Sequence, residues 1–139
     1  MKRRRFRLLP HTADIRLEVR GRDLPELFAE SVTALFSLLT DRRKVRARES
    51  RVLRGADGDP VDQLFHLLRE ALLLHSLDRF LARDARGTME SSGVTVEVAG
   101  ETYDASRHAL HREIKAVTAH AMAIEKGPGG YIARFVVDV

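Results

Sequence analysis

The stretch from residue 23 to residue 39 reads as an amphipathic helix with a defined start, and it constrains the fold more than any other feature. Asp23 can cap the first free amides, Pro25 fits the first turn, and Glu26 stands three residues after the cap. Apolar residues then recur at spacings of three and four, which places them on one helical face. They are Leu24, Leu27, Phe28, Val32, Leu35, Phe36 and Leu39. We therefore expect a helix to about Leu39 whose broad stripe forms part of the core.

A second helix is predicted from Pro60 to about Leu77. Asp59 can cap it, with Pro60 at its first position. Its main apolar face carries Val61, Leu64, Phe65, Leu68 and Leu72, and further leucines widen that face. A helix this apolar packs on more than one side or meets a partner. The oligomeric state stays open for that reason.

The remaining apolar segments are typical of strands. Ile15, Leu17 and Val19 alternate with charged residues, which is the period of a half-buried strand. Further strands are expected at 6–9, 80–89 and 94–98, with a weaker one at 45–53. A hairpin is expected from 121–125 and 131–137, joined by the Gly-Pro-Gly-Gly turn.

Length and composition indicate one globular domain over 1–139. The chain has 139 residues, 44% hydrophobic and 32% charged, which suits a packed core rather than a disordered chain. There is no cysteine, so disulfides and thiolate metal sites are excluded. The N-terminus lacks the apolar region of a signal peptide, and no apolar run spans a bilayer. We expect a cytoplasmic protein that does not enter a membrane.

The net charge of +4 depends mainly on arginine, which supplies 20 of the 24 basic residues. Arginine favours planar contacts with phosphate or carboxylate, so RNA or an acidic protein surface is a possible partner. The alternative is a compositional bias without a partner. The charge alone does not choose between these interpretations.

Two acidic residues stand out by their context. Asp14 lies at the mouth of the strand that contains Ile15, and Asp138 ends an almost uniformly apolar strand. The α-carboxylate of Val139 is one residue away. If the three groups converge, they must take up a proton or bind a cation, and all-oxygen ligands suit Ca²⁺, Mg²⁺ or Mn²⁺. The alternative is two separate surface acids.

Protonatable side chains are concentrated between residues 100 and 120. Three of the six histidines fall in this stretch, together with several acids and bases. Such crowding favours a functional site, although a solvated loop has the same composition. The candidates are Asp104, His108, Lys115 and His120, with His11 in the turn before Asp14. Whether Arg112–Thr118 forms a strand or a helical turn is not decided by its pattern.

The motifs at the two ends of the chain resemble one family. They are HTADI at 11–15, GETYD at 100–104 with Arg107-His108, IKAVT at 114–118 followed by His120, and the terminal VVDV. In this order they resemble the archease family over essentially the whole chain. The resemblance implies an α+β fold with a strand-helix-strand-strand (SHS2-like) core and an inserted strand and helix segment. It implies two main helices on a mostly antiparallel sheet.

The resemblance also implies a function. Archeases are not enzymes; they activate the GTP- and Mn²⁺-dependent RNA ligase of the RtcB type in tRNA splicing or RNA repair. They promote ligase guanylylation and multiple turnover. The family's metal ligands correspond to Asp14, Asp138 and Val139, with Ca²⁺ the first candidate ion. The family's functional surface corresponds to the region around Lys115. Contact with tRNA or RNA would be indirect.

Two other functions remain open. A basic RNA- or tRNA-binding module would explain the arginine excess and would bind RNA with a steep salt dependence, although no strand is studded with base-stacking aromatic residues. A metal-assisted phosphoester hydrolase would use Asp14, Asp138 and His120. It would turn over a phosphoester with added divalent ion, but no nucleophile-activating pair is evident in the sequence.

Overall fold

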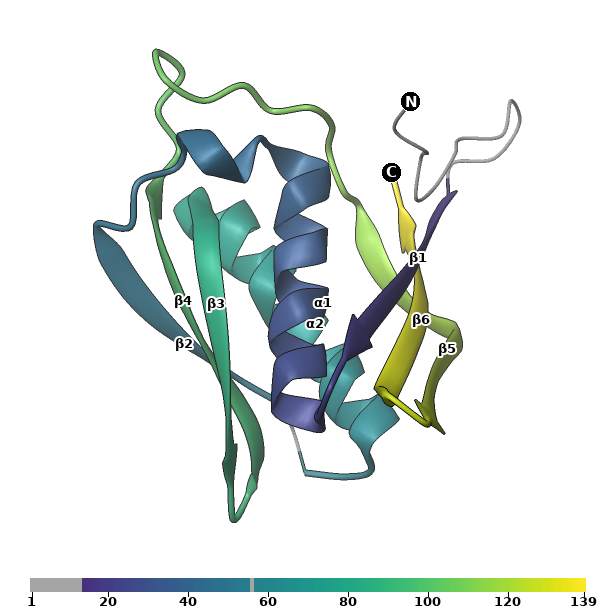
Figure 1. Ribbon diagram of the computed structural model, residues 1–139. Helices are drawn as coiled ribbons and strands as arrows, with labels where there is room; N and C mark the ends of the chain where they lie inside the picture. Colours follow the sequence, from purple (N-terminus) through teal and green to yellow (C-terminus); the bar gives the residue numbers. More distant parts are fainter. Residues whose placement is uncertain (1–13, 56) are drawn as a thin grey trace.

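A computed structural model describes residues 14–55 and 57–139 of the chain (Figure 1). The elements in chain order are β1 (Asp14–Gly21), α1 (Leu24–Leu39), the 3₁₀ turn η1 (Arg42–Lys44), β2 (Glu49–Arg54), α2 (Pro60–Asp78), β3 (Phe80–Glu90), β4 (Gly93–Thr102), β5 (Ala116–Gly127) and β6 (Gly130–Asp138). The strand expected at 6–9 and the residue His11 lie outside the described residues. The described elements follow the predicted order.

The strands form two antiparallel sheets of three strands, in the orders β1-β6-β5 and β2-β4-β3. Figure 1 shows both helices between these sheets; α1 contacts β3 and β1, and α2 contacts β5 and β2. The predicted α+β class with two main helices is therefore confirmed. The expected mostly antiparallel sheet is divided in two, so the helices are covered on both sides.

Helix α1 has the bounds and the start that its sequence predicts. The Asp23 carboxylate accepts a hydrogen bond of 2.9 Å from the amide of Glu26, which satisfies one of the free donors of the first turn. The side chains of Phe28 and Phe36 are fully buried. Since one sheet lies on each side of the helix, its broad apolar stripe is removed from water by both.

Helix α2 begins as predicted, with the Asp59 carboxylate accepting 2.9 Å from the amide of Asp62. Its inner face, which includes Leu64 and Leu68, is buried. Leu77 on the outer face is 76% exposed. No helix in the described part of the chain is long and apolar enough to cross a membrane.

Two strands begin at other residues than expected: β2 begins later than predicted, and β5 begins before the predicted 121–125. The strand predicted at 45–53 begins only at Glu49, because residues 42–48 form η1 and a loop pinned by Val45, which is fully buried. Residues 111–115 form neither helix nor strand, and β5 begins at Ala116. The question left open for Arg112–Thr118 is thus resolved as a loop that enters a strand.

The start of α1 lies against β3 at Gly87. A Cβ atom on Gly87 would lie 2.0 Å from the carbonyl oxygen of Pro25, a separation that no packed pair of atoms sustains. Glycine is therefore required here for the close approach of helix and strand. This contact fixes the position of the β2-β4-β3 sheet relative to α1.

Candidate functional site

Asp14 and Asp138 face each other across the β1–β6 ladder. Their Cα atoms are partners in the register, and both residues are half-buried. The neighbouring carboxyl group of Asp14 raises the pKa of Asp138, and burial raises it further. Two acids far apart in the sequence therefore meet at one end of the β1-β6-β5 sheet. A cation bound between them would relieve the repulsion between like charges.

Lys115 lies beside this acidic pair. Its amide donates a 2.8 Å hydrogen bond to the carbonyl oxygen of Asp138, and the next residue, Ala116, is the register partner of Asp138. The side chain of Lys115 is exposed, and its positive charge lowers the pKa of Asp138, against the larger effect of Asp14. Ile114 and Val117 are buried on either side and anchor the segment. The residue just before β5 thus brings one cation to the two acids.

The donor set at this end of the sheet fits a hard divalent cation. Asp14 and Asp138 provide carboxylate oxygens, and Val139 follows directly, with its side chain packed against the core. Carboxylate oxygens are the ligands that Ca²⁺, Mg²⁺ and Mn²⁺ prefer. Among the described residues no group of three or more His, Asp or Glu side chains gathers around a potential metal position. The fit therefore depends on the pair and on the predicted carboxylate of Val139.

His120 lies on an irregular part of β5. The β5–β6 register shifts between Thr118 and Ala123, and Ala121 inside this bulge has a φ of 61°, in the left-handed region. That conformation is unfavourable for a residue with a Cβ atom. The amide of His120 donates 3.1 Å to the Thr118 hydroxyl, and its side chain is exposed. The bulge was not predicted, because no glycine, proline or asparagine marks it between residues 118 and 123.

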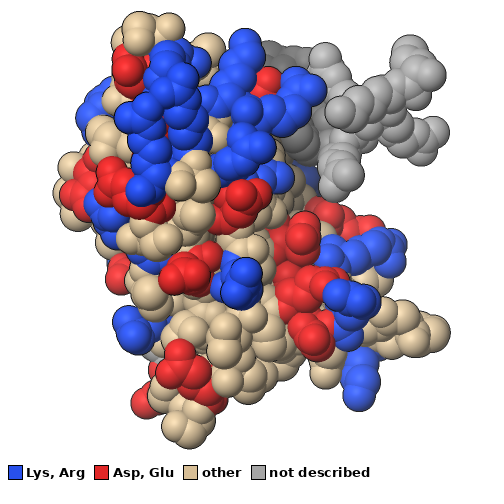
Figure 2. Space-filling model, turned by 60° about the vertical axis from the view of Figure 1, so that its left-hand side comes forward, with Lys and Arg blue, Asp and Glu red and all other residues tan. Residues whose placement is uncertain are grey.

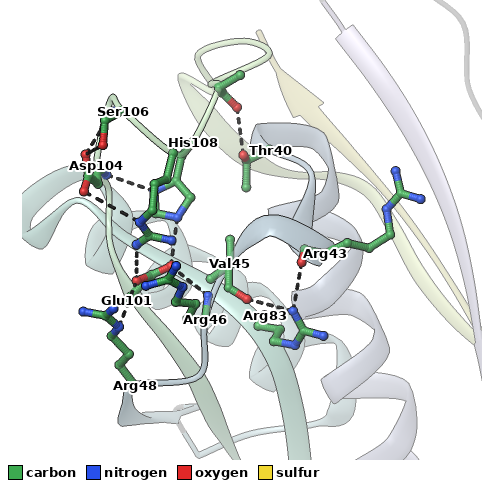
Figure 3. A network of polar contacts seen from close by, with 12 residues as sticks. Thr40, Arg43, Val45, Arg46, Arg48, Arg83, Glu101, Asp104, Ser106 and His108 are labelled. Atoms are coloured by element: carbon green, nitrogen blue, oxygen red, sulfur yellow. Dashed lines mark hydrogen bonds and ion pairs between the residues drawn. The ribbon is translucent and has the colours of Figure 1, made fainter.

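A second polar centre lies at the end of β4, around Glu101 (Figure 3). The Glu101 carboxylate is only 5% exposed and accepts hydrogen bonds from the Arg46 amide at 2.7 Å and from the Arg107 guanidinium. Arg48 lies 3.6 Å from it. Burial alone would raise the pKa of Glu101, but these hydrogen bonds outweigh burial and lower it to about 2. Glu101 is therefore a buried anion that ties three segments together.

His108 belongs to this centre and not to the surface. Its Nδ1 accepts 2.9 Å from the Asp104 amide, so the proton is on Nε2, which lies 2.9 Å from Glu101. The imidazole side chain is fully buried. The prediction that His108 forms part of an exposed functional surface is therefore wrong; the residue holds the loop in place. Asp104 is exposed, and two hydrogen bonds from Ser106 lower the pKa of its carboxyl.

The loop between β4 and β5 carries the polar stretch from one sheet to the other. Figure 1 shows it crossing above the end of α1. The amide of His111 donates a hydrogen bond of 2.8 Å to the carbonyl oxygen of Leu39. The guanidinium of Arg112 donates one of 3.0 Å to the carbonyl oxygen of Leu38. These bonds satisfy carbonyls that the helix end leaves without intrahelical partners. The predicted candidates therefore separate: Asp104 and His108 lie at the β2-β4-β3 sheet, and Lys115 lies beside the acidic pair.

Comparison with known proteins identifies the family. The model of the archease protein family matches residues 6–139. Protein archease of Thermococcus gammatolerans is 35% identical over 141 residues, which cover 98% of this chain and 99% of the relative. Protein archease of Methanopyrus kandleri is 35% identical over 135 residues, covering 94% and 96%.

Solved structures share the fold. The solution structure of Methanobacterium thermoautotrophicum protein 1598 has a TM-score of 0.79 and 29% identity, with 97% of this chain and 99% of that chain covered. The crystal structure of a Thermotoga maritima archease, described as a possible chaperone, has a TM-score of 0.65 and 21% identity, with 96% of each chain covered. The family match extends over nearly all of the sequence, including both strands that carry the acidic pair. The chain belongs to the archease family.

Proposed function

We propose that this protein is a non-catalytic activator of a GTP- and Mn²⁺-dependent RNA ligase of the RtcB type. It would promote guanylylation of the ligase and its multiple turnover in tRNA splicing or RNA repair, in the cytoplasm. Membership of the archease family supports this assignment. The observation that carries it is the pairing of Asp14 with Asp138 beside the exposed Lys115.

The acidic pair and Lys115 form a compact charged tip at one end of the β1-β6-β5 sheet. Both acids lie in paired strands, so little backbone freedom is lost when their carboxylates bind an ion. When bound, a divalent cation would neutralise the two carboxylates and offer further coordination positions. Asp14, Asp138 and Val139 would hold it, and Lys115 would contact an acidic or phosphate group of the partner.

Ion binding by the isolated protein tests the first half of this proposal. Calorimetric titration with Ca²⁺, Mg²⁺ or Mn²⁺ should show one site, and Asp14→Asn or Asp138→Asn should abolish it. Asp57→Asn is the matched control, because Asp57 is an exposed acid in a loop away from the tip. Since the Asp138 pKa is raised, protons should compete with the ion and affinity should fall as the pH falls through that pKa. A folded Asp14→Asn protein that binds the ion like wild type would refute the site.

Ligase guanylylation with labelled GTP tests the second half. Wild type and Asp57→Asn should stimulate the reaction, whereas Asp14→Asn, Asp138→Asn and Lys115→Gln should not. Circular dichroism would establish that each variant is folded. If the Asp14→Asn protein loses the ion but still stimulates the ligase fully, the ion has no part in activation. If wild type does not stimulate the ligase at all, the proposed function is wrong.

A further inference from the structure

A dense group of cationic side chains surrounds η1 and the loop that follows it. We call the basic surface the set Arg42, Arg43, Lys44, Arg46 and Arg48 from this loop and Arg83 from β3. Figure 2 shows Lys and Arg side chains gathered over the end of the molecule where this loop lies. The acidic pair is on the other sheet, so the proposed function makes no use of this surface.

The backbone of the loop is fixed to β3 and β4. The Arg83 guanidinium donates hydrogen bonds of 2.8 Å to the carbonyl oxygen of Val45 and of 3.0 Å to that of Arg43. The Arg42 guanidinium in turn donates a hydrogen bond to the carbonyl oxygen of Arg83. The Arg46 amide is bound by the buried Glu101, and Figure 3 shows these contacts converging on the loop. The loop therefore presents its side chains from a defined backbone.

Most of these contacts leave the positive charge uncompensated. Arg42 and Arg83 donate to neutral carbonyl oxygens, and Arg42 also donates to the Ser37 hydroxyl. Among the described residues, three carboxylates contact the six cations: Asp41 with Arg43, Asp84 with Arg83, and Glu101 with Arg48. An excess of three positive charges remains, and Glu101 also serves Arg107.

Lys44 and Arg46 are the cations most available to a partner. Both are exposed, and within the described part of the chain neither side chain has a hydrogen-bond or ion-pair partner. They flank the buried Val45, so the backbone between them is anchored. Two solvated cations on an anchored backbone suit a polyanion with regularly spaced charges.

The chemistry of the surface favours RNA over an acidic protein. No large apolar side chain is exposed between residues 41 and 48, since Val45 is buried and Ala47 is small. Protein interfaces need an apolar centre, whereas nucleic-acid interfaces are polar and strongly positive. No aromatic residue belongs to the basic surface either, so bases have no stacking platform there. The contacts that remain are those to phosphates.

We propose that the basic surface binds the phosphate backbone of RNA directly, without preference for base sequence. Arginine guanidinium groups are suited to phosphate because they donate two parallel hydrogen bonds, and Lys44 adds a point charge. RNA binding at this surface is independent of the acidic pair and of any ligase.

Fluorescence anisotropy with a labelled RNA hairpin tests the proposal on the full chain alone. Binding should weaken steeply with salt, and hairpins of unrelated sequence should bind equally. The double variant Lys44→Gln/Arg46→Gln should bind about ten-fold more weakly and reduce the log–log salt slope by about 2. Arg54→Gln/Arg86→Gln is the matched control, because it removes the same charge from exposed residues nearer the β3–β4 hairpin. Its affinity should change less than about two-fold.

The variant Lys44→Arg/Arg46→Lys keeps both positive charges but changes both side chains. It tests whether RNA binding depends on the charge or on the exact side chains. It should bind RNA as wild type does, and thermal melts should confirm that all three variants are folded. Equal losses of RNA affinity in the two Gln variants would show a general effect of net charge and would refute binding at the basic surface. So would the absence of RNA binding by wild type, or binding that ignores salt. Displacement of RNA by polyglutamate at equal charge concentration would assign the surface to an acidic protein instead.

Discussion

Replacement of Glu101 by glutamine should destabilise the protein more than any other removal of a single charge near the loop. The Glu101 carboxylate accepts through both oxygens: Oε1 from Arg107, and Oε2 from the Arg46 amide at 2.7 Å and from His108 at 2.9 Å. Glutamine has the same shape but only one accepting oxygen. Its NH₂ group must face a donor on one side or the other.

The magnitude follows from the bonds that are lost. Hydrogen bonds to a charged group contribute about 1.5–3 kcal/mol each, and a buried donor left unsatisfied adds to that cost. The hydrogen bonds accepted by one carboxylate oxygen are lost in the variant. Those accepted by the other oxygen remain, but they are weaker because the acceptor is no longer charged. We therefore expect Glu101→Gln to lower the free energy of unfolding by about 2–4 kcal/mol. For a domain of this size the melting temperature should fall by about 6–12 °C.

The effect should also depend on pH. Hydrogen bonds lower the folded-state pKa of Glu101 to about 2, below its ordinary value of 4.5. The unfolded state therefore takes up the proton first as the pH falls. The stability that the carboxylate adds is complete above a pH of about 5 and is lost as the pH falls toward 2. The difference between wild type and Glu101→Gln should shrink over the same interval.

Urea unfolding can be followed by circular dichroism at neutral pH and at several acidic pH values. It measures the loss in free energy of unfolding and how that loss depends on pH. Glu97→Gln is the control, because Glu97 is an exposed acid on the same strand. It should change stability by no more than about 0.5 kcal/mol. A Glu101→Gln protein within 1 kcal/mol of wild type, or a difference that does not vary with pH, would refute the assigned role.

Two further predictions concern α1. Gly87→Ala should lower the free energy of unfolding by about 1–3 kcal/mol, because the new methyl group meets the carbonyl oxygen of Pro25. An unchanged midpoint of urea unfolding would show that α1 and β3 can move apart at this contact without loss of stability. Asp23→Ala should cost about 1 kcal/mol through loss of the cap to the Glu26 amide, whereas Asp23→Ser should keep most of that stability in the same titration.

Local patterns predicted the helices well. The cap and apolar spacing of α1 and α2 operate within a few residues, and their starts at Leu24 and Pro60 agree with the structure. The sequence raised the meeting of Asp14 and Asp138 only as one of two alternatives, and the register of β1 and β6 shows that the two acids do meet. Their role in binding an ion stays a prediction.

The division of the strands into two sheets was not foreseen. Alternation indicates a strand but does not say which strand it pairs with, and that choice depends on contacts remote in sequence. The burial of Glu101 and His108 was missed for a related reason. Nothing in their neighbours distinguishes a buried charged pair from exposed residues; only the fold places Arg46 and Arg107 around them.

The strand β1 pairs on one side only, with β6, so within the described residues its other edge carries backbone groups without a strand partner. Such an edge is a template on which a second copy of the chain can add a strand. Here Arg16, Glu18 and Arg20 project outward in a row between buried aliphatic side chains. A strand that docked there would have to strip water from three charges at once. The alternation of buried and charged residues along β1 therefore fills the core and also disfavours strand pairing between neighbouring molecules.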